Sequence, residues 1–273
     1  MSTTMTPPAH AAAARAMRSP SLTRVVGLLR HNLKLWLADV QVPIVLVGMP
    51  LAMTAFLRPV YRDTLAASGL HDATGAEQAV PGMAVMFALL GAGILAADLH
   101  RERQWATWDR LRASGARAGE IIVGKLLPAL VVIGGQLAVL FAAGVGMFGL
   151  EVAGSVPGLA AVAAAFAVAM LALGLVLSSL IRSITTLGAV GNALAVTFAG
   201  LGGAVVPLSA MPGWAMAVAP LSPAYWAMLG FRAAVVDAGG TWPVLQATGS
   251  LLLFALLLGG IAAWRLRNAE PHS

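Results

Sequence analysis

Long runs without a single charged residue are the feature that most constrains this chain. Each run holds about 20 mostly apolar residues, which is enough for an α-helix to cross the hydrocarbon core of a bilayer. Only 10% of the 273 residues are charged and 59% are hydrophobic, whereas soluble domains carry about a quarter charged residues. The sequence therefore predicts an integral membrane protein.

Six runs are predicted to span the membrane, which makes the fold all-α. They are residues 40–57, 78–97, 126–150, 158–181, 184–206 and 242–264. The uncharged stretch 183–231 could instead hold two spans, but its second half carries four prolines. Proline removes a backbone donor and clashes with the preceding turn, which leaves pieces too short to cross. We therefore expect a re-entrant extracellular hairpin over 207–236, just before the last span.

The positions of the basic residues set the orientation. With six spans, 14 of the 17 lysines and arginines lie on the side that holds the loop 98–125. Seven spans would move Arg265 and Arg267 to the opposite side. The positive-inside rule then makes both termini cytoplasmic. The same bias explains the net charge of +6 without nucleic-acid binding, for which the sequence offers no continuous basic groove.

The segment before the first span is amphipathic. Over residues 21–38, apolar side chains recur at helical spacing, and Arg24, Arg30 and Lys34 occupy the other face. Such a helix is typical of one that lies along the inner membrane surface. Residues 1–20 lack the apolar core of a signal peptide and are predicted to be a disordered cytoplasmic tail. The transmembrane domain is expected over 39–264, with a cytoplasmic tail over 265–273.

The loop 98–125 is too long and too charged to be a simple link. It carries six basic and four acidic side chains between two spans. Trp105, Trp108 and Leu111 recur every three residues and would form an apolar ridge with a charged rim. A rigid aromatic ridge of this kind favours docking of a soluble partner. Anchoring of the tryptophans at the lipid headgroups is the alternative interpretation.

The sequence offers no pattern typical of a catalytic, cofactor or metal site. The chain has no cysteine, and no histidine falls within a predicted span near a serine. The stretch 119–126 matches most of the phosphate-loop pattern, but Leu126 replaces the hydroxyl residue that would hold Mg²⁺. No ionisable side chain falls within a predicted span, which disfavours an ion-coupled carrier.

Three polar side chains are predicted at membrane depth. They are Gln136 in the third span and Asn192 and Thr197 in the fifth. They either line a substrate path or form interhelical hydrogen bonds, and the sequence leaves both roles open.

These features together resemble the type-2 ABC transporter permeases, which include membrane subunits of daunorubicin, multidrug and polysaccharide exporters. The local match is Glu102-Arg-x-x-x-Thr107-x-x-Arg110-Leu-Arg112, ending in Gly124-Lys125. Ala106 stands where family members often have glycine. The resemblance implies that a coupling helix in the loop docks on a separate ATPase subunit, which binds the ATP and magnesium. The implied docking residues are Glu102, Arg103, Trp105, Thr107, Trp108, Arg110, Leu111 and Arg112, and residues 21–38 would be the interface helix.

The resemblance also implies a function. The chain would be a non-enzymatic permease in a bacterial cell membrane, paired with a second copy or a homologue. It would export an amphiphilic drug or natural product, as in multidrug efflux and antibiotic resistance, or a lipid-linked glycan. The hairpin 207–236 would cap the exit. An ion-coupled secondary transporter and a non-transporting membrane scaffold remain as alternatives.

Overall fold

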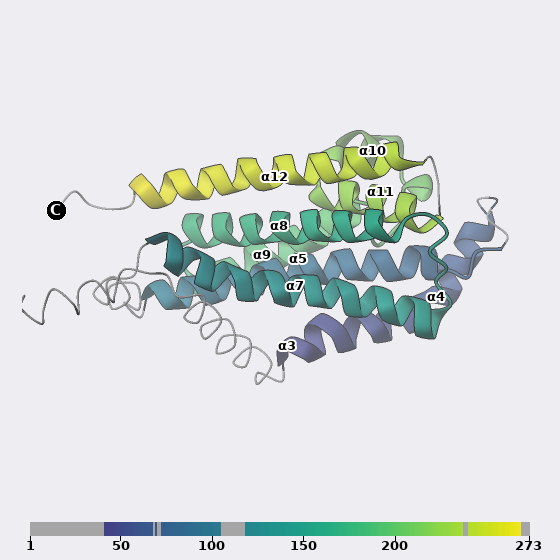
Figure 1. The fold of residues 1–273 in the computed structure, drawn as a ribbon, viewed down its shortest axis with the longest axis horizontal. Helices are drawn as coiled ribbons and strands as arrows, with labels where there is room; N and C mark the ends of the chain where they lie inside the picture. Colours follow the sequence, from purple (N-terminus) through teal and green to yellow (C-terminus); the bar gives the residue numbers. More distant parts are fainter. Residues whose placement is uncertain (1–40, 68, 70–71, 105–117, 237–239, 269–273) are drawn as a thin grey trace, which may run out of the picture.

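The computed structural model describes residues 41–67, 69, 72–104, 118–236 and 240–268, and all regular structure within them is helical (Figure 1). Six helices in this part of the chain are long and apolar enough to cross a membrane. They cover Ile44–Ala67, Ala76–Arg101, Leu126–Phe148, Val156–Leu180, Ile184–Leu201 and Thr241–Arg265. The prediction of an all-α membrane protein with six spans is confirmed.

The elements follow one another along the chain with short connections. They are α3 (Gln41–Pro43), the π-helical turn η1 (Ile44–Gly48), α4 (Met49–Ala67), α5 (Ala76–Gln104), α7 (Ala118–Phe148), α8 (Val156–Leu180), α9 (Ile184–Leu201), the 3₁₀ turn η2 (Leu208–Ala210), α10 (Gly213–Val218), the 3₁₀ turn η3 (Ala219–Leu221), α11 (Pro223–Val236) and α12 (Thr241–Asn268).

The long helices lie roughly side by side along the longest axis of the molecule and alternate in direction (Figure 1). At one end α5 ends and α7 begins, and we call this the loop end. At the other end α4 connects to α5, and α10 and α11 lie there too. We call this the cap end. We call the segment 202–222, which joins α9 to α11 at this end, the cap.

Helix α5 is the centre of the bundle. It packs against α4, α7, α8, α9 and α11, and most of its side chains are buried, among them Val80, Ala84 and Ala88. A helix that is apolar all round is expected at such a central position. In the outer helices α4, α9 and α12 only 22% of the span residues are buried in this single chain, so lipid or another chain can contact the rest.

The first span is irregular between Pro43 and Pro50. Five residues there, Ile44–Gly48, form a π-helical turn, in which the Met49 N–H donates to the Ile44 carbonyl. A wider turn of this kind bends a helix locally. The helix then continues to Ala67, ten residues beyond the predicted end of the span.

The segment predicted as a hairpin contains no seventh long helix. Its longest element, α11, has 14 residues and measures about 21 Å at 1.5 Å per residue. That length falls short of the roughly 30 Å hydrocarbon core. One face of α11 is buried against α8, α12 and α5. The depth of this segment in a bilayer stays a prediction.

A capping box starts α5 at the cap end. The Glu77 carboxylate accepts the Thr74 hydroxyl at 3.0 Å and the Gly75 N–H at 2.9 Å, and the Ala76 N–H donates to the Thr74 hydroxyl at 3.2 Å. Threonine followed three residues later by glutamate is the sequence signature of this motif. Arg58 of α4 joins it, because its Nε donates to the Thr74 carbonyl at 3.1 Å.

Replacing the capping carboxylate should destabilise the fold. We expect Glu77→Ala to lower the free energy of unfolding by about 1–2 kcal/mol, because it leaves donors at the start of α5 without acceptors. Equilibrium unfolding in detergent micelles measures the change. Glu151→Ala is the control, since the Glu151 carboxylate at the same end is exposed. Equal stability of the two variants would contradict this role.

Candidate transport path and docking loop

The predicted docking surface lies mostly outside the described residues. This applies to Trp105, Thr107, Trp108, Arg110, Leu111 and Arg112 of the loop, and to Arg24, Arg30 and Lys34 of the interface helix. The backbone of Glu102 and Arg103 is described and belongs to the last turn of α5. The roles of all these residues stay predictions.

The two helices that flank the loop extend into it. Helix α5 continues through Gln104 and α7 begins at Ala118, so both ends of the predicted loop are helical. With 29 residues, α5 is about 44 Å long and joins the cap end to the loop in a single helix. The exposed ion pair between Asp98 and Arg101, at 3.8 Å, contributes little to stability at such a surface.

Helix α9 has a buried stripe of mostly small residues and an exposed side that includes polar ones. Its buried stripe is Leu187, Gly191, Ala195 and Ala199, and α9 packs against α5. A Cβ added to Gly191 would lie 3.4 Å from the Gly93 Cα, so the two backbones approach closely at this point. Small residues at four-residue spacing allow such approach in membrane helices. The small residues of this stripe are therefore a packing surface against α5.

The broad exposed side of α9 carries the two polar residues predicted at depth, which lie five positions apart and therefore about 140° apart around the helix. Asn192 and Thr197 are both exposed, near the middle of an 18-residue apolar helix. A polar group that faces hydrocarbon without a hydrogen-bonding partner costs free energy. This face therefore fits water, substrate or a second protein chain better than it fits lipid.

Gln136 of α7 occupies a different environment. Its side chain is 2% exposed, and neither Oε1 nor Nε2 has a hydrogen-bond partner among the described residues. The role of Gln136 in a substrate path stays a prediction. A buried amide without partners costs about 1–3 kcal/mol of folding free energy. Gln136 therefore destabilises the folded bundle.

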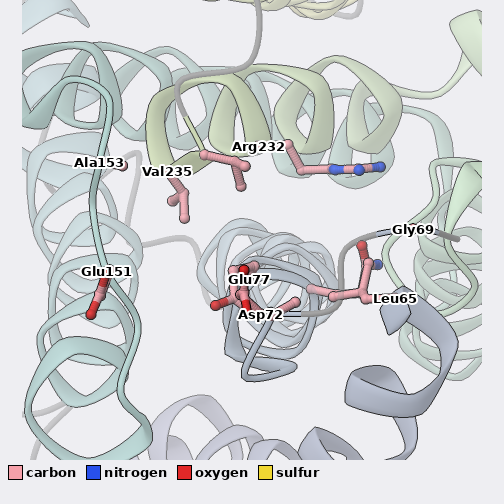
Figure 2. Close-up of a pocket in the computed structure, with 11 residues that line it drawn as sticks. Leu65, Gly69, Asp72, Glu77, Glu151, Ala153, Arg232 and Val235 are labelled. Carbon is pink, nitrogen blue, oxygen red and sulfur yellow. The ribbon is translucent and has the colours of Figure 1, made fainter. Parts of the chain in front are cut away.

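A pocket of about 290 Å³ opens at the cap end. Figure 2 shows Glu151 and Arg232 on opposite sides of it, and Asp72 and Glu77 also line it. Glu77 is engaged in the capping box described above. The remaining wall is mostly apolar and includes Val235. Sequence reasoning missed this pocket because α4, α5, the 149–155 connection and α11 each supply only part of its wall.

Comparison with protein families places most of the chain in one of them. Residues 23–236 match the family model described as ABC-2 type transporter. The matched region covers five of the six long helices found in the described residues and the whole loop 98–125, for which docking is predicted. A comparison with curated proteins found no match.

The effect of the buried Gln136 amide on the free energy of unfolding can be measured directly. We expect Gln136→Leu to raise the free energy of unfolding by about 1–3 kcal/mol, because an apolar side chain of similar size replaces a buried amide without partners. Equilibrium unfolding in detergent micelles is again the measurement. Gln246→Leu is the matched control, because Gln246 is exposed on α12. A destabilised Gln136→Leu would show that the amide does have a partner.

Proposed function

The chain belongs to the ABC-2 type transporter family, and from that premise we propose that it is the permease of an exporter driven by a separate ATPase. The observation that carries this proposal is the family match over residues 23–236. The family supplies the membrane component of ABC transporters. Export, the ATPase partner, the dimer and the substrate class are the proposed part.

The docking loop is the proposed site for the ATPase. By the spacing in the sequence, its tryptophans and Leu111 would form an apolar ridge, with Arg110 and Arg112 supplying charge around it. The partner, and not this chain, would bind ATP and Mg²⁺, because the phosphate-loop-like stretch 119–126 lacks the hydroxyl that holds the metal. Closure of the ATPase pair would displace the loop ends of α5 and α7.

The open face of α9 is the proposed wall of the transport path. Asn192 and Thr197 are exposed there at membrane depth, and a second copy of the chain or a homologue would cover them. The face is otherwise built of small and apolar side chains, such as Ala193 and Val196, and it carries no charge. An uncharged wall with a few hydrogen-bonding groups suits an amphiphilic substrate.

The substrate we favour is an amphiphilic drug or natural product, with a lipid-linked glycan as the second candidate. The proposed setting is a bacterial cell membrane with both termini in the cytoplasm. The excess of lysine and arginine on the loop side supports that orientation. The loop end of the bundle would then face the cytoplasm, and the cap end would face outward.

The docking proposal is tested by charge reversal. We expect Arg110→Glu with Arg112→Glu to abolish ATP-driven export and release the ATPase, because acidic side chains would replace the two basic side chains proposed to contact the ATPase. Co-purification with the ATPase and membrane insertion are both measured. Arg62→Glu is the control, since Arg62 is exposed at the cap end. Unchanged co-purification of the double variant would refute docking through these residues.

Transport in reconstituted vesicles distinguishes the exporter from a secondary transporter and from a non-transporting scaffold. Uptake of a fluorescent amphiphilic dye is followed in vesicles that hold only the permease and its ATPase. Dye flux driven by an ion gradient without ATP would favour a secondary transporter. Absence of ATP-dependent flux for a panel of amphiphilic dyes and a lipid-linked glycan would favour a scaffold.

The dimer proposal is tested by cross-linking. The chain contains no cysteine, so a single introduced cysteine reports on its own surroundings. We expect Thr197→Cys to form a disulfide-linked dimer in oxidised membranes, because α9 would face its copy across the path. Leu256→Cys is the control, since Leu256 is 74% exposed on α12. A dimer through position 256 alone would place the interface elsewhere.

A further inference from the structure

Three consecutive backbone carbonyls at the start of the cap contact α4 and α5. Gln78 Nε2 donates to the Gly203 carbonyl at 2.8 Å, and the Tyr61 hydroxyl donates to the Val205 carbonyl at 2.6 Å. Between them, the Ala204 carbonyl lies so close to Gly82 that a Cβ added there would overlap it. We call this set of contacts the clasp.

The clasp supplies hydrogen-bond donors to backbone carbonyls that lack helical partners after the end of α9. The helix ends at Leu201, and Gly203 turns the chain with a φ of +82°, so the following carbonyls have no helical partner. Buried backbone carbonyls require donors. Gln78 is 1% exposed and Tyr61 is 5% exposed, so water competes little for these two hydrogen bonds.

The other end of the cap is fixed to α9. The Ser222 hydroxyl donates to the Phe198 carbonyl at 2.9 Å, and the Trp226 indole N–H donates to the Pro220 carbonyl at 2.9 Å. The cap is therefore held at its first residues by α4 and α5 and by its continuation from α9, where the Gly202 and Ala204 N–H groups donate to α9 carbonyls. Its last residues are held by α9 and by α11, which carries Trp226. Movement of α5 would act on the first residues of the cap through the clasp.

Helix α5 connects the clasp to the opposite end of the molecule. Gln78 and Gly82 lie one turn apart near its first residues, and Glu102 lies near its last. The helix is continuous between these points and about 44 Å long, with Pro81 between Gln78 and Gly82. Arg58 also ties the end of α4 to the start of α5, so Tyr61 moves with the same unit.

We propose that Tyr61 and Gln78 are positioning residues: their hydrogen bonds make the first residues of the cap move together with α5. Displacement of the docking loop would move the first residues of the cap together with α5, and the cap would open or close by that motion. The inference rests on the proposed function for the source of the motion. The clasp itself is a set of contacts within one chain.

Distances between spin labels test the proposal in the assembled transporter. Two double-cysteine chains, bound to the ATPase in lipid nanodiscs, are compared without nucleotide and with ATP trapped by vanadate. One carries labels at Ser209 and Arg62, and the other at Ser209 and Trp242; all three positions are exposed. We expect the distance from Ser209 to Arg62 to stay constant and the distance from Ser209 to Trp242 to shift. A shift of the first distance, or of neither, would overturn the proposal.

Substitutions in the clasp give an independent test in the chain without the ATPase. Tyr61→Phe and Gln78→Leu each remove one donor and keep the size of the side chain. One net hydrogen bond changes a two-state population about fivefold, and two change it roughly thirtyfold. We therefore expect the Ser209–Arg62 distance distribution to broaden in each variant and most in the double variant. Distributions equal to those of the controls would overturn the proposal.

The chain offers matched controls for each substitution. Tyr225→Phe removes the hydroxyl of the only other tyrosine, and Gln246→Leu removes an exposed amide. Gly82→Ala pushes the Ala204 carbonyl away without removing a donor, whereas Gly134→Ala adds a methyl group where no atom lies within 4 Å. We expect broadening with Gly82→Ala and none with Gly134→Ala.

Failure of the two proposals can be told apart. Loss of ATPase binding by the unaltered chain counts against the proposed function, and the clasp variants still show whether α5 holds the cap. ATP hydrolysis by the bound ATPase without a shift from Ser209 to Trp242 counts against the inference alone. If the double variant does not reach the membrane, Tyr61→Phe and the distances in the unaltered clasp decide the question.

Discussion

Within a bilayer, backbone groups have no water to bond, so every N–H and C=O must find a partner inside the protein. The long helices meet this requirement by themselves, but the break after Leu201 does not. The carbonyls of Gly203 and Val205 receive side-chain donors from Gln78 and Tyr61. These two bonds, with the close approach of Ala204 to Gly82, hold the start of the cap against α4 and α5.

Close approach of backbones makes these bonds geometrically possible. Gly82 leaves room for the Ala204 carbonyl, and Gly93 faces Gly191 farther along the same pair of helices. Helix α9 is therefore held against α5 by small residues on one side, and its other side stays open. That open side carries Asn192 and Thr197. The packing that stabilises the centre of the bundle thus determines which polar residues can face a transport path.

Two glutamines show how little the residue type alone reveals. Gln78 and Gln136 are both buried, and each lies in a helix that the charge-free runs predicted. Gln78 donates to a carbonyl 125 positions away, whereas both polar atoms of Gln136 lack partners within the described part of the chain. Sequence reasoning singled out Gln136 for its depth and overlooked Gln78 at the start of its span. The polar residue that fixes the cap was therefore the less conspicuous of the two.

The sequence by itself predicted the six spans found in the described residues, the lack of a long helix within 207–236 and the proposed orientation, because apolar length, proline content and charge bias are properties of local composition. It also contained the capping signal of Thr74 and Glu77. Only the tertiary structure decided which faces of the helices meet and how the cap is held. The Tyr61 hydroxyl and the Val205 carbonyl are 144 positions apart, and helix packing, which no local pattern encodes, brings them together.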